Sequence, residues 1–142
     1  MHFANSITIR RPPAEVFAYL ATFENIPRWN YAIAETHRTS AGPLGVGATY
    51  RQHRTVPRPA DESFEVVEFE PNRRLAIQGD LGPLHGTLRY ELEAVPEGTR
   101  LTNEADLSGS GLAAIVAPLA ASQIREAVGA NLGELRAILE AA

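Results

Sequence analysis

Apolar and polar residues alternate along most of this chain, and a period of two predicts β-strands. Strands are expected at residues 3–10, 31–40, 48–56, 62–70, 75–78, 87–95 and 100–107. The connections between most of them are short: Pro71-Asn72 and Pro96-Glu97-Gly98 form turns, and residues 79–83 form a loop. Consecutive strands joined by short turns pair in antiparallel fashion. The pattern therefore predicts a seven-stranded antiparallel sheet.

Apolar residues spaced three and four apart predict helices that cover this sheet. Two short helices are expected at residues 14–22 and 25–29, after the first strand. A long C-terminal helix is expected to begin between about residues 110 and 118, with Pro118 kinking or restarting it. Its apolar stripe comprises Ile115, Leu119, Ile124, Val128, Leu132, Leu135 and Leu139. These elements form an α+β fold, in which a curved sheet wraps around the long helix and leaves a concave space. Residues 112–118 are expected to act as a gate over its mouth.

Composition and charge exclude several classes of function. The thirteen basic residues are all Arg, and against seventeen acidic residues they give a net charge of −4. The basic excess of a nucleic-acid or anionic-membrane binder is therefore missing. Without Lys there is no Schiff-base chemistry, and without Cys there is no thiol nucleophile, disulfide or thiolate metal site.

Neither a signal peptide nor a membrane-spanning segment is visible in the sequence. We therefore expect a cytoplasmic protein, a monomer or homodimer, with no nucleic-acid partner and no membrane insertion. Composition is ordinary for a globular chain, and its 142 residues are interpreted as one domain spanning residues 1–142.

Short motifs with known chemistry are incomplete in this chain. Gly45-Val46-Gly47 lacks the lysine and the following helix of a phosphate-binding loop, so it is interpreted as a hairpin turn. Ser108 and Ser110 lie in a Gly/Ser connection and not in a nucleophile elbow. The four histidines lack the spacing of a helical metal site, and we expect neither a metal nor a cofactor.

Several longer segments, in order, resemble one protein superfamily. They are IRRPPAEVFAYL at 9–20, NIPRW at 25–29, GPLGVGATY at 42–50, VVEFEPNRRL at 66–75 and GTRLT at 98–102. Together they resemble the START-like (Bet v 1-like, SRPBCC) superfamily, and within it the polyketide cyclase/dehydrase and lipid transport group. The resemblance covers essentially the whole chain. It implies a helix-grip fold with a hydrophobic cavity held by the last helix.

Candidate ligand-binding residues are the polar and aromatic side chains expected to point inward, together with part of the helix stripe. They are Trp29, Tyr50, Gln52, Tyr90, Asn103, Val116, Leu119 and Val128. An apolar cavity with a few convergent polar groups is what a ligand site requires. The alternative, that Tyr and Trp only fill the core, stays open. Cyclases of this family also use Arg and Tyr residues of the sheet to bind or protonate substrate. Arg54 is expected on the same strand face as Tyr50, but it lies near the end of that strand.

Three functions fit these observations. The first is binding of a small hydrophobic or aromatic molecule, polyketide- or lipid-like, in the cavity. The second is an aromatase/cyclase-type enzyme that acts by acid–base assistance, with its catalytic residues unknown. The third is a non-catalytic scaffold whose cavity is filled by side chains. The sequence leaves open whether any reaction is catalysed and which ligand is bound.

Overall fold

Seven antiparallel strands form one sheet in the computed structural model, which describes residues 1–116 and 120–142. The strands are β1 (His2–Ile9), β2 (Ile33–Arg38), β3 (Thr49–Arg54), β4 (Ala60–Glu70), β5 (Arg74–Leu81), β6 (Leu84–Val95) and β7 (Gly98–Ser108). Their order across the sheet is β1-β7-β6-β5-β4-β3-β2, so β2 to β7 form a meander and β1 pairs with β7. The predicted seven-stranded antiparallel sheet is confirmed.

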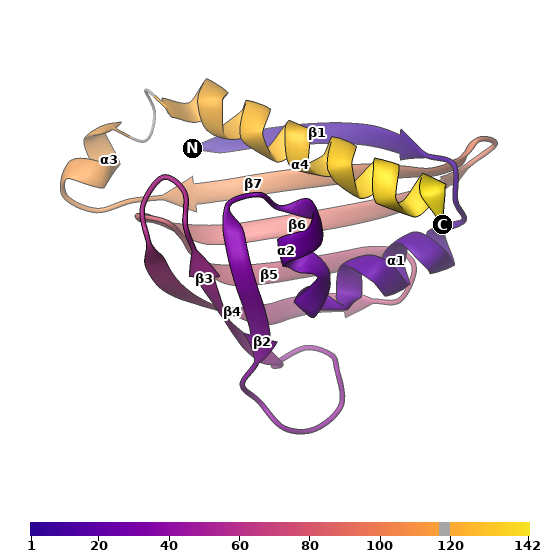
Figure 1. The fold of residues 1–142 in the computed structure, drawn as a ribbon, viewed down its shortest axis with the longest axis horizontal. Coiled ribbons are helices and arrows are strands. Elements are labelled where there is room, and N and C mark those ends of the chain that lie inside the picture. Colours follow the sequence, from indigo (N-terminus) through magenta and orange to yellow (C-terminus); the bar gives the residue numbers. More distant parts are fainter. Residues whose placement is uncertain (117–119) are drawn as a thin grey trace.

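The helices lie on one face of this sheet, except the short helix of residues 112–116, which lies beyond its end (Figure 1). They are α1 (Pro13–Ala21), the 3₁₀ turn η1 (Phe23–Asn25), α2 (Ile26–Trp29), α3 (Leu112–Val116) and α4 (Ala121–Ala141). Helix α4 crosses the sheet on the side of β1 and β7, and α1 and α2 cover β5 and β6 (Figure 1). The predicted helix-grip arrangement, a curved sheet around a long C-terminal helix with two short helices after the first strand, is confirmed.

The C-terminal helix differs from the prediction in its first part. The long helix α4 begins at Ala121, and residues 112–116 form the short helix α3 instead. Helix α3 lies beyond the end of the sheet (Figure 1), and Ile115 is 68% exposed. The expectation that Ile115 belongs to the core seam was therefore wrong, because this helix does not lie over the sheet. Pro118 lies outside the described residues, so the gate over residues 112–118 stays a prediction.

The strand pair β5–β6 extends into the segment that was expected to be a loop. Strand β5 continues to Leu81, and Gly79 pairs with Gly86 on β6. A Cβ atom on Gly79 would overlap the carbonyl oxygen of Ser63, and one on Gly86 would overlap that of Asp106. The neighbouring backbones approach so closely at these two positions that only glycine fits between them. The sequence predicted a loop at residues 79–83, whereas Gly79 lies within a strand and allows the neighbouring strands to approach closely.

The core lies between the sheet and the helices. Leu132, Leu135 and Leu139 of α4 are buried against the inward face, as the helical stripe predicted. Side chains anchor α4 at both ends: Asn5 Nδ2 of β1 donates to the Arg125 carbonyl (3.2 Å), and the Arg10 backbone N–H donates to Glu140 Oε2 (2.8 Å). The position of α4 over β1 is therefore held by polar contacts as well as by apolar burial.

Candidate ligand-binding pocket

A pocket of about 430 Å³ lies between the N-terminal half of α4 and the ends of β3 and β5. From α4 and the residue before it come Ala120, Gln123, Ile124, Ala127, Val128 and Asn131. From α2 to β4 come Asn30, Tyr31, Ala32, Arg54, Val56 and Pro57, and from the β5–β6 connection come Leu81, Gly82, Pro83 and Leu84. Most of this wall is apolar. Among these lining residues, Arg54 carries the only side chain charged at neutral pH.

Arg54 forms a buried ion pair with Glu62 beside the pocket. Its Nε donates to Glu62 Oε2 (2.7 Å) and its Nη2 donates to Oε1 (3.1 Å), a two-pronged pairing. The two side chains are 8% and 1% exposed. Such a pair is stable in a low-dielectric interior only when its geometry is good and its remaining polar atoms are satisfied.

Additional donors complete the environment of Glu62. Gln52 Nε2 donates to Glu62 Oε1 (2.9 Å), and the backbone N–H of Gly82 donates to Oε2. With the two bonds from Arg54, the carboxylate accepts four hydrogen bonds. Glu62 therefore ties strand β3 and the β5–β6 turn to β4, and it shapes the sheet side of the pocket.

Two asparagines that line the pocket each accept a backbone hydrogen bond on the side-chain amide oxygen. Asn131 Oδ1 on α4 accepts from the Tyr31 N–H (3.4 Å), and Asn30 Oδ1 accepts from the Ala32 N–H (3.0 Å). Asn131 is almost completely buried, yet it lines the pocket. These bonds orient both carboxamides, whose NH₂ groups are then additional hydrogen-bond donors beside the pocket.

Of the eight residues predicted to bind a ligand, Val128 lines this pocket. Trp29 is buried next to the lining residue Asn30, and Gln52 contacts the pocket indirectly through Glu62. Val116 is the last residue of α3, and Leu119 lies outside the described residues.

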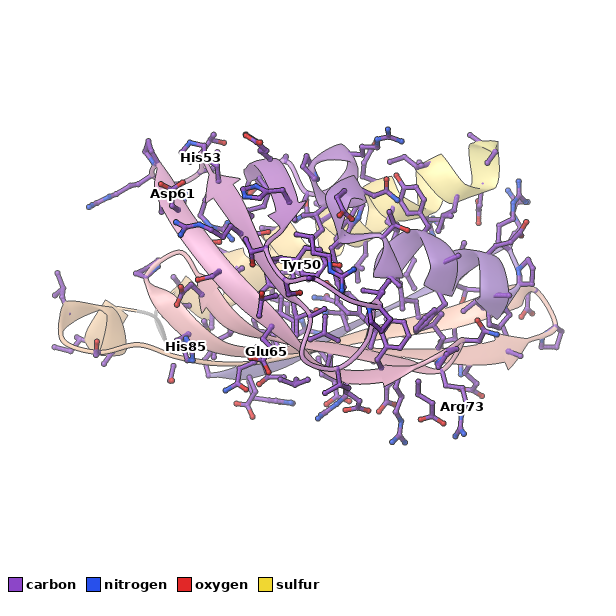
Figure 2. All side chains as sticks on the ribbon, turned by 90° about the horizontal axis from the view of Figure 1, so that it is seen from below. Tyr50, His53, Asp61, Glu65, Arg73 and His85 are labelled. Carbon is purple, nitrogen blue, oxygen red and sulfur yellow. The ribbon has the colours of Figure 1, made fainter. Side chains whose placement is uncertain are left out.

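The remaining three predicted residues, Tyr50, Tyr90 and Asn103, point inward as expected but are packed within the core. Figure 2 shows Tyr50 in the interior, whereas Glu65 projects from the outer face of the sheet. The Tyr50 ring stacks on Phe64 with 5.2 Å between ring centroids, and Phe23 packs edge-on against it at 4.8 Å. These three side chains are absent from the pocket wall, and their part in ligand binding stays a prediction.

Burial also affects the ionisation of the two inward tyrosines. It raises the pKa of Tyr90 well above the ordinary value for tyrosine, because the phenolate would lie in an apolar interior. Burial likewise raises the pKa of Tyr50; the Glu24 carboxylate adds to the rise and Arg38 opposes it. Both hydroxyls therefore remain protonated at neutral pH, where they can donate a hydrogen bond but cannot act as a base.

The sequence interpretation missed Glu62, Asn30 and Asn131 and left the direction of Arg54 open. A signal for Glu62 was available, because Glu62 lies two residues before Phe64 and four before Val66 on β4, and all three share the inward face. Asn131 lies one residue before Leu132 of the helical stripe, and the periodic pattern alone gives it no special role. Its contribution depends on the approach of Tyr31 from another element.

The histidines lie at exposed positions on the sheet. His53 Nδ1 lies 3.0 Å from Asp61 Oδ1, and His85 Nδ1 lies 3.3 Å from Asp80 Oδ1, each a cross-strand pair. Residues 1–116 and 120–142 contain no group of three His, Asp or Glu side chains arranged to hold a metal ion. Within the same residues, no helix combines the length and apolar character needed to cross a membrane.

The family model described as polyketide cyclase / dehydrase and lipid transport matches residues 1–140, and the chain belongs to this family. One curated relative is the uncharacterized protein Rv2574 of Mycobacterium tuberculosis, which is 29% identical over 104 residues. That match covers 70% of this chain and 61% of the relative, so the chain spans about three fifths of the relative's length.

Two solved structures show the same fold at low sequence identity. TTHA0849 from Thermus thermophilus has a TM-score of 0.82 at 14% identity, with 99% of this chain and 98% of that chain covered. The di-domain ARO/CYC StfQ from the steffimycin biosynthetic pathway has a TM-score of 0.80 at 14% identity, with 98% of this chain and 50% of that chain covered.

Proposed function

We propose that this chain binds a small hydrophobic or aromatic molecule, polyketide- or lipid-like, in the pocket beside α4. The observation that carries the proposal is an apolar pocket of about 430 Å³ with a few polar groups at its wall. Ligand sites typically have volumes of about 300–1,000 Å³, apolar walls and a small number of placed polar groups. This pocket has room for a body of two or three rings.

The pocket volume also bears on the alternative of a filled scaffold. If side chains filled the interior, no space of this size would remain between α4 and the sheet. The apolar side chains Ile124 and Val128 of α4 are only partly buried by protein and face this space. An apolar ligand that covers these two side chains removes their remaining exposed surface from water, and this burial favours binding.

A second candidate, an aromatase/cyclase-type activity, is favoured by one specific observation, the inward position of Arg54. A guanidinium remains charged at all relevant pH values, so Arg54 is suited to polarise a carbonyl and not to transfer a proton. A synthetic β-polyketone incubated with the protein tests this candidate by product analysis. An activity that survives in Arg54→Gln would contradict the assignment of this role to Arg54.

Binding is tested first by native mass spectrometry of freshly purified protein, which reveals any small molecule that co-purifies. A direct titration then uses prodan, an uncharged two-ring fluorescent ketone, with Trp29 emission as a second signal. Trp29 is the single tryptophan of the chain and is adjacent to the lining residue Asn30, so bound prodan should alter its emission.

Two matched variants locate the binding site. Ala127 lines the pocket, whereas Ala130 on the same helix is exposed. Ala127→Phe should weaken prodan binding by about tenfold or more because the ring occupies the space, and Ala130→Phe should leave it unchanged within about twofold. Equal affinity of both variants and the original chain would place prodan elsewhere and refute the pocket assignment.

A further inference from the structure

The lining residues Arg54, Asn30 and Asn131 carry hydrogen-bond donors, whereas the lining side chains of Gln123 and Tyr31 can both donate and accept. Arg54 has no acceptor atom; two of its five N–H groups are used by Glu62, and a third reaches a backbone carbonyl. The amide oxygens of Asn131 and Asn30 each already accept one backbone hydrogen bond, and the side-chain N–H groups add donors at the pocket wall. Donors from the sheet and from the helix side therefore border one apolar space.

The charge of Arg54 is already compensated before any ligand enters. Glu62 is almost completely buried, pairs with Arg54 through both carboxylate oxygens, and receives further hydrogen bonds from Gln52 and Gly82. A ligand carboxylate or phosphate beside this pair would be a third charge without a free counter-ion in an apolar pocket. Removing such a charge from water is strongly unfavourable.

On the basis of the proposed binding function, we infer that the pocket selects uncharged ligands whose polar group is a hydrogen-bond acceptor. Ketone, ester, lactone and quinone carbonyls belong to this class. Glu62 is the residue that sets this selectivity, because it neutralises Arg54 while leaving free Arg54 N–H groups. Asn131 contributes a donor from the helix side. Free fatty-acid carboxylates and phosphorylated headgroups are excluded by the same arrangement.

Three naphthalenes substituted at the same ring position test this inference by displacement of prodan. Acetylnaphthalene carries an uncharged acceptor, naphthoate is ionised at neutral pH, and ethylnaphthalene has no polar group. Acetylnaphthalene should bind about two- to tenfold more tightly than ethylnaphthalene, which corresponds to one net hydrogen bond. Naphthoate should bind roughly tenfold or more weakly than acetylnaphthalene because its charge is not compensated.

Glu62→Gln tests the role assigned to Glu62. This variant leaves the Arg54 charge without its counter-ion, so naphthoate affinity should rise about tenfold and approach that of acetylnaphthalene. Glu65→Gln is the matched control on the same strand; Glu65 is exposed on the outer face, and its removal should leave the order of the three ligands unchanged (Figure 2).

Asn131→Asp is the second variant, and it covers the case in which Glu62→Gln does not fold. It keeps an acceptor for the Tyr31 N–H but removes the NH₂ donor, so it should reduce the advantage of acetylnaphthalene over ethylnaphthalene, while the Arg54 donors remain. Failure of prodan and all three naphthalenes to bind would overturn the proposed function itself. Equal binding of the three, or naphthoate bound as tightly as acetylnaphthalene by the original chain, would overturn the selectivity while leaving the pocket intact.

Discussion

Arg54 and Glu62 lie diagonally across strands β3 and β4, with Glu62 directly opposite Gln52 and Arg54 opposite Ala60. This diagonal lets the guanidinium span both carboxylate oxygens while Gln52 reaches one of them from the side. The pair is buried where β3, β4 and the β5–β6 turn meet. The ion pair of Arg54 and Glu62 therefore contributes both to the stability of the sheet and to the shape of the pocket wall.

The first prediction concerns the removal of one partner of this pair. Glu62→Ala should lower the free energy of unfolding by about 3–5 kcal/mol, because it leaves Arg54 buried and uncompensated. The double variant Arg54→Met with Glu62→Leu should recover most of that loss. Urea unfolding measures both. As a control, Glu70→Ala, which breaks an exposed pair with Arg73, should cost less than about 1 kcal/mol.

The second prediction concerns the coiled region of the sheet. Gly79→Ala should destabilise the protein by about 1–3 kcal/mol or more, since the added methyl group would overlap the backbone of Ser63 and Phe64. Gly45→Ala is the control, because open space surrounds that position. Thermal unfolding compares the two variants. A neutral Gly79→Ala would show that the strands are less closely coiled than in this structure.

The third prediction concerns stability at alkaline pH. Tyr90 has a pKa raised above the ordinary 10.0 in the folded state, so the unfolded chain ionises first and releases its proton at lower pH. The contribution of protonated Tyr90 to the free energy of unfolding is complete below about pH 10 and is lost as the pH rises beyond it. The free energy of unfolding then falls with a slope that approaches about 1.4 kcal/mol per pH unit. The chain has no Lys or Cys, which removes two kinds of group that titrate in this range, whereas Tyr50, whose pKa is also raised, adds to the same decline.

Tyr90→Phe should therefore flatten the alkaline decline in the free energy of unfolding, measured by urea unfolding at several pH values. Tyr31→Phe is the control, because Tyr31 is 61% exposed. An identical alkaline decline in Tyr90→Phe and in the original chain would contradict the assignment of this effect to Tyr90.

The fourth prediction tests whether the inward sheet residues take part in binding. Asn103→Ala should weaken prodan binding by up to about tenfold if its carboxamide meets the ligand carbonyl. Tyr50→Ala should weaken it further, because contact area is also lost. Glu91→Ala on the outer face should have no effect. The titrations use only variants whose circular dichroism matches that of the original chain, and unchanged affinity in Asn103→Ala would confine the site to the pocket beside α4.

The order of strands, the short helices and the two faces of the sheet follow from local patterns. Period-two alternation fixes which side chains share a face, and it placed Tyr50, Gln52 and Asn103 on the inward side, where the structure has them. Helical spacing likewise identified Leu132, Leu135 and Leu139 as the stripe that packs on the sheet. Both features could be predicted from the sequence, because each depends only on residues that are close together along the chain.

Only the tertiary structure decided which part of the inward face is hollow. Phe23, from a turn far away in the sequence, packs against Tyr50 and Phe64 and fills one region. Small residues of α4 such as Ala127 leave space near Arg54 in another. The alternation along a strand determines the face to which a side chain points. A cavity depends instead on the side-chain volumes that distant segments bring together. The pairing of Arg54 with Glu62 and the approach of Tyr31 to Asn131 arise for the same reason, since each joins separate elements.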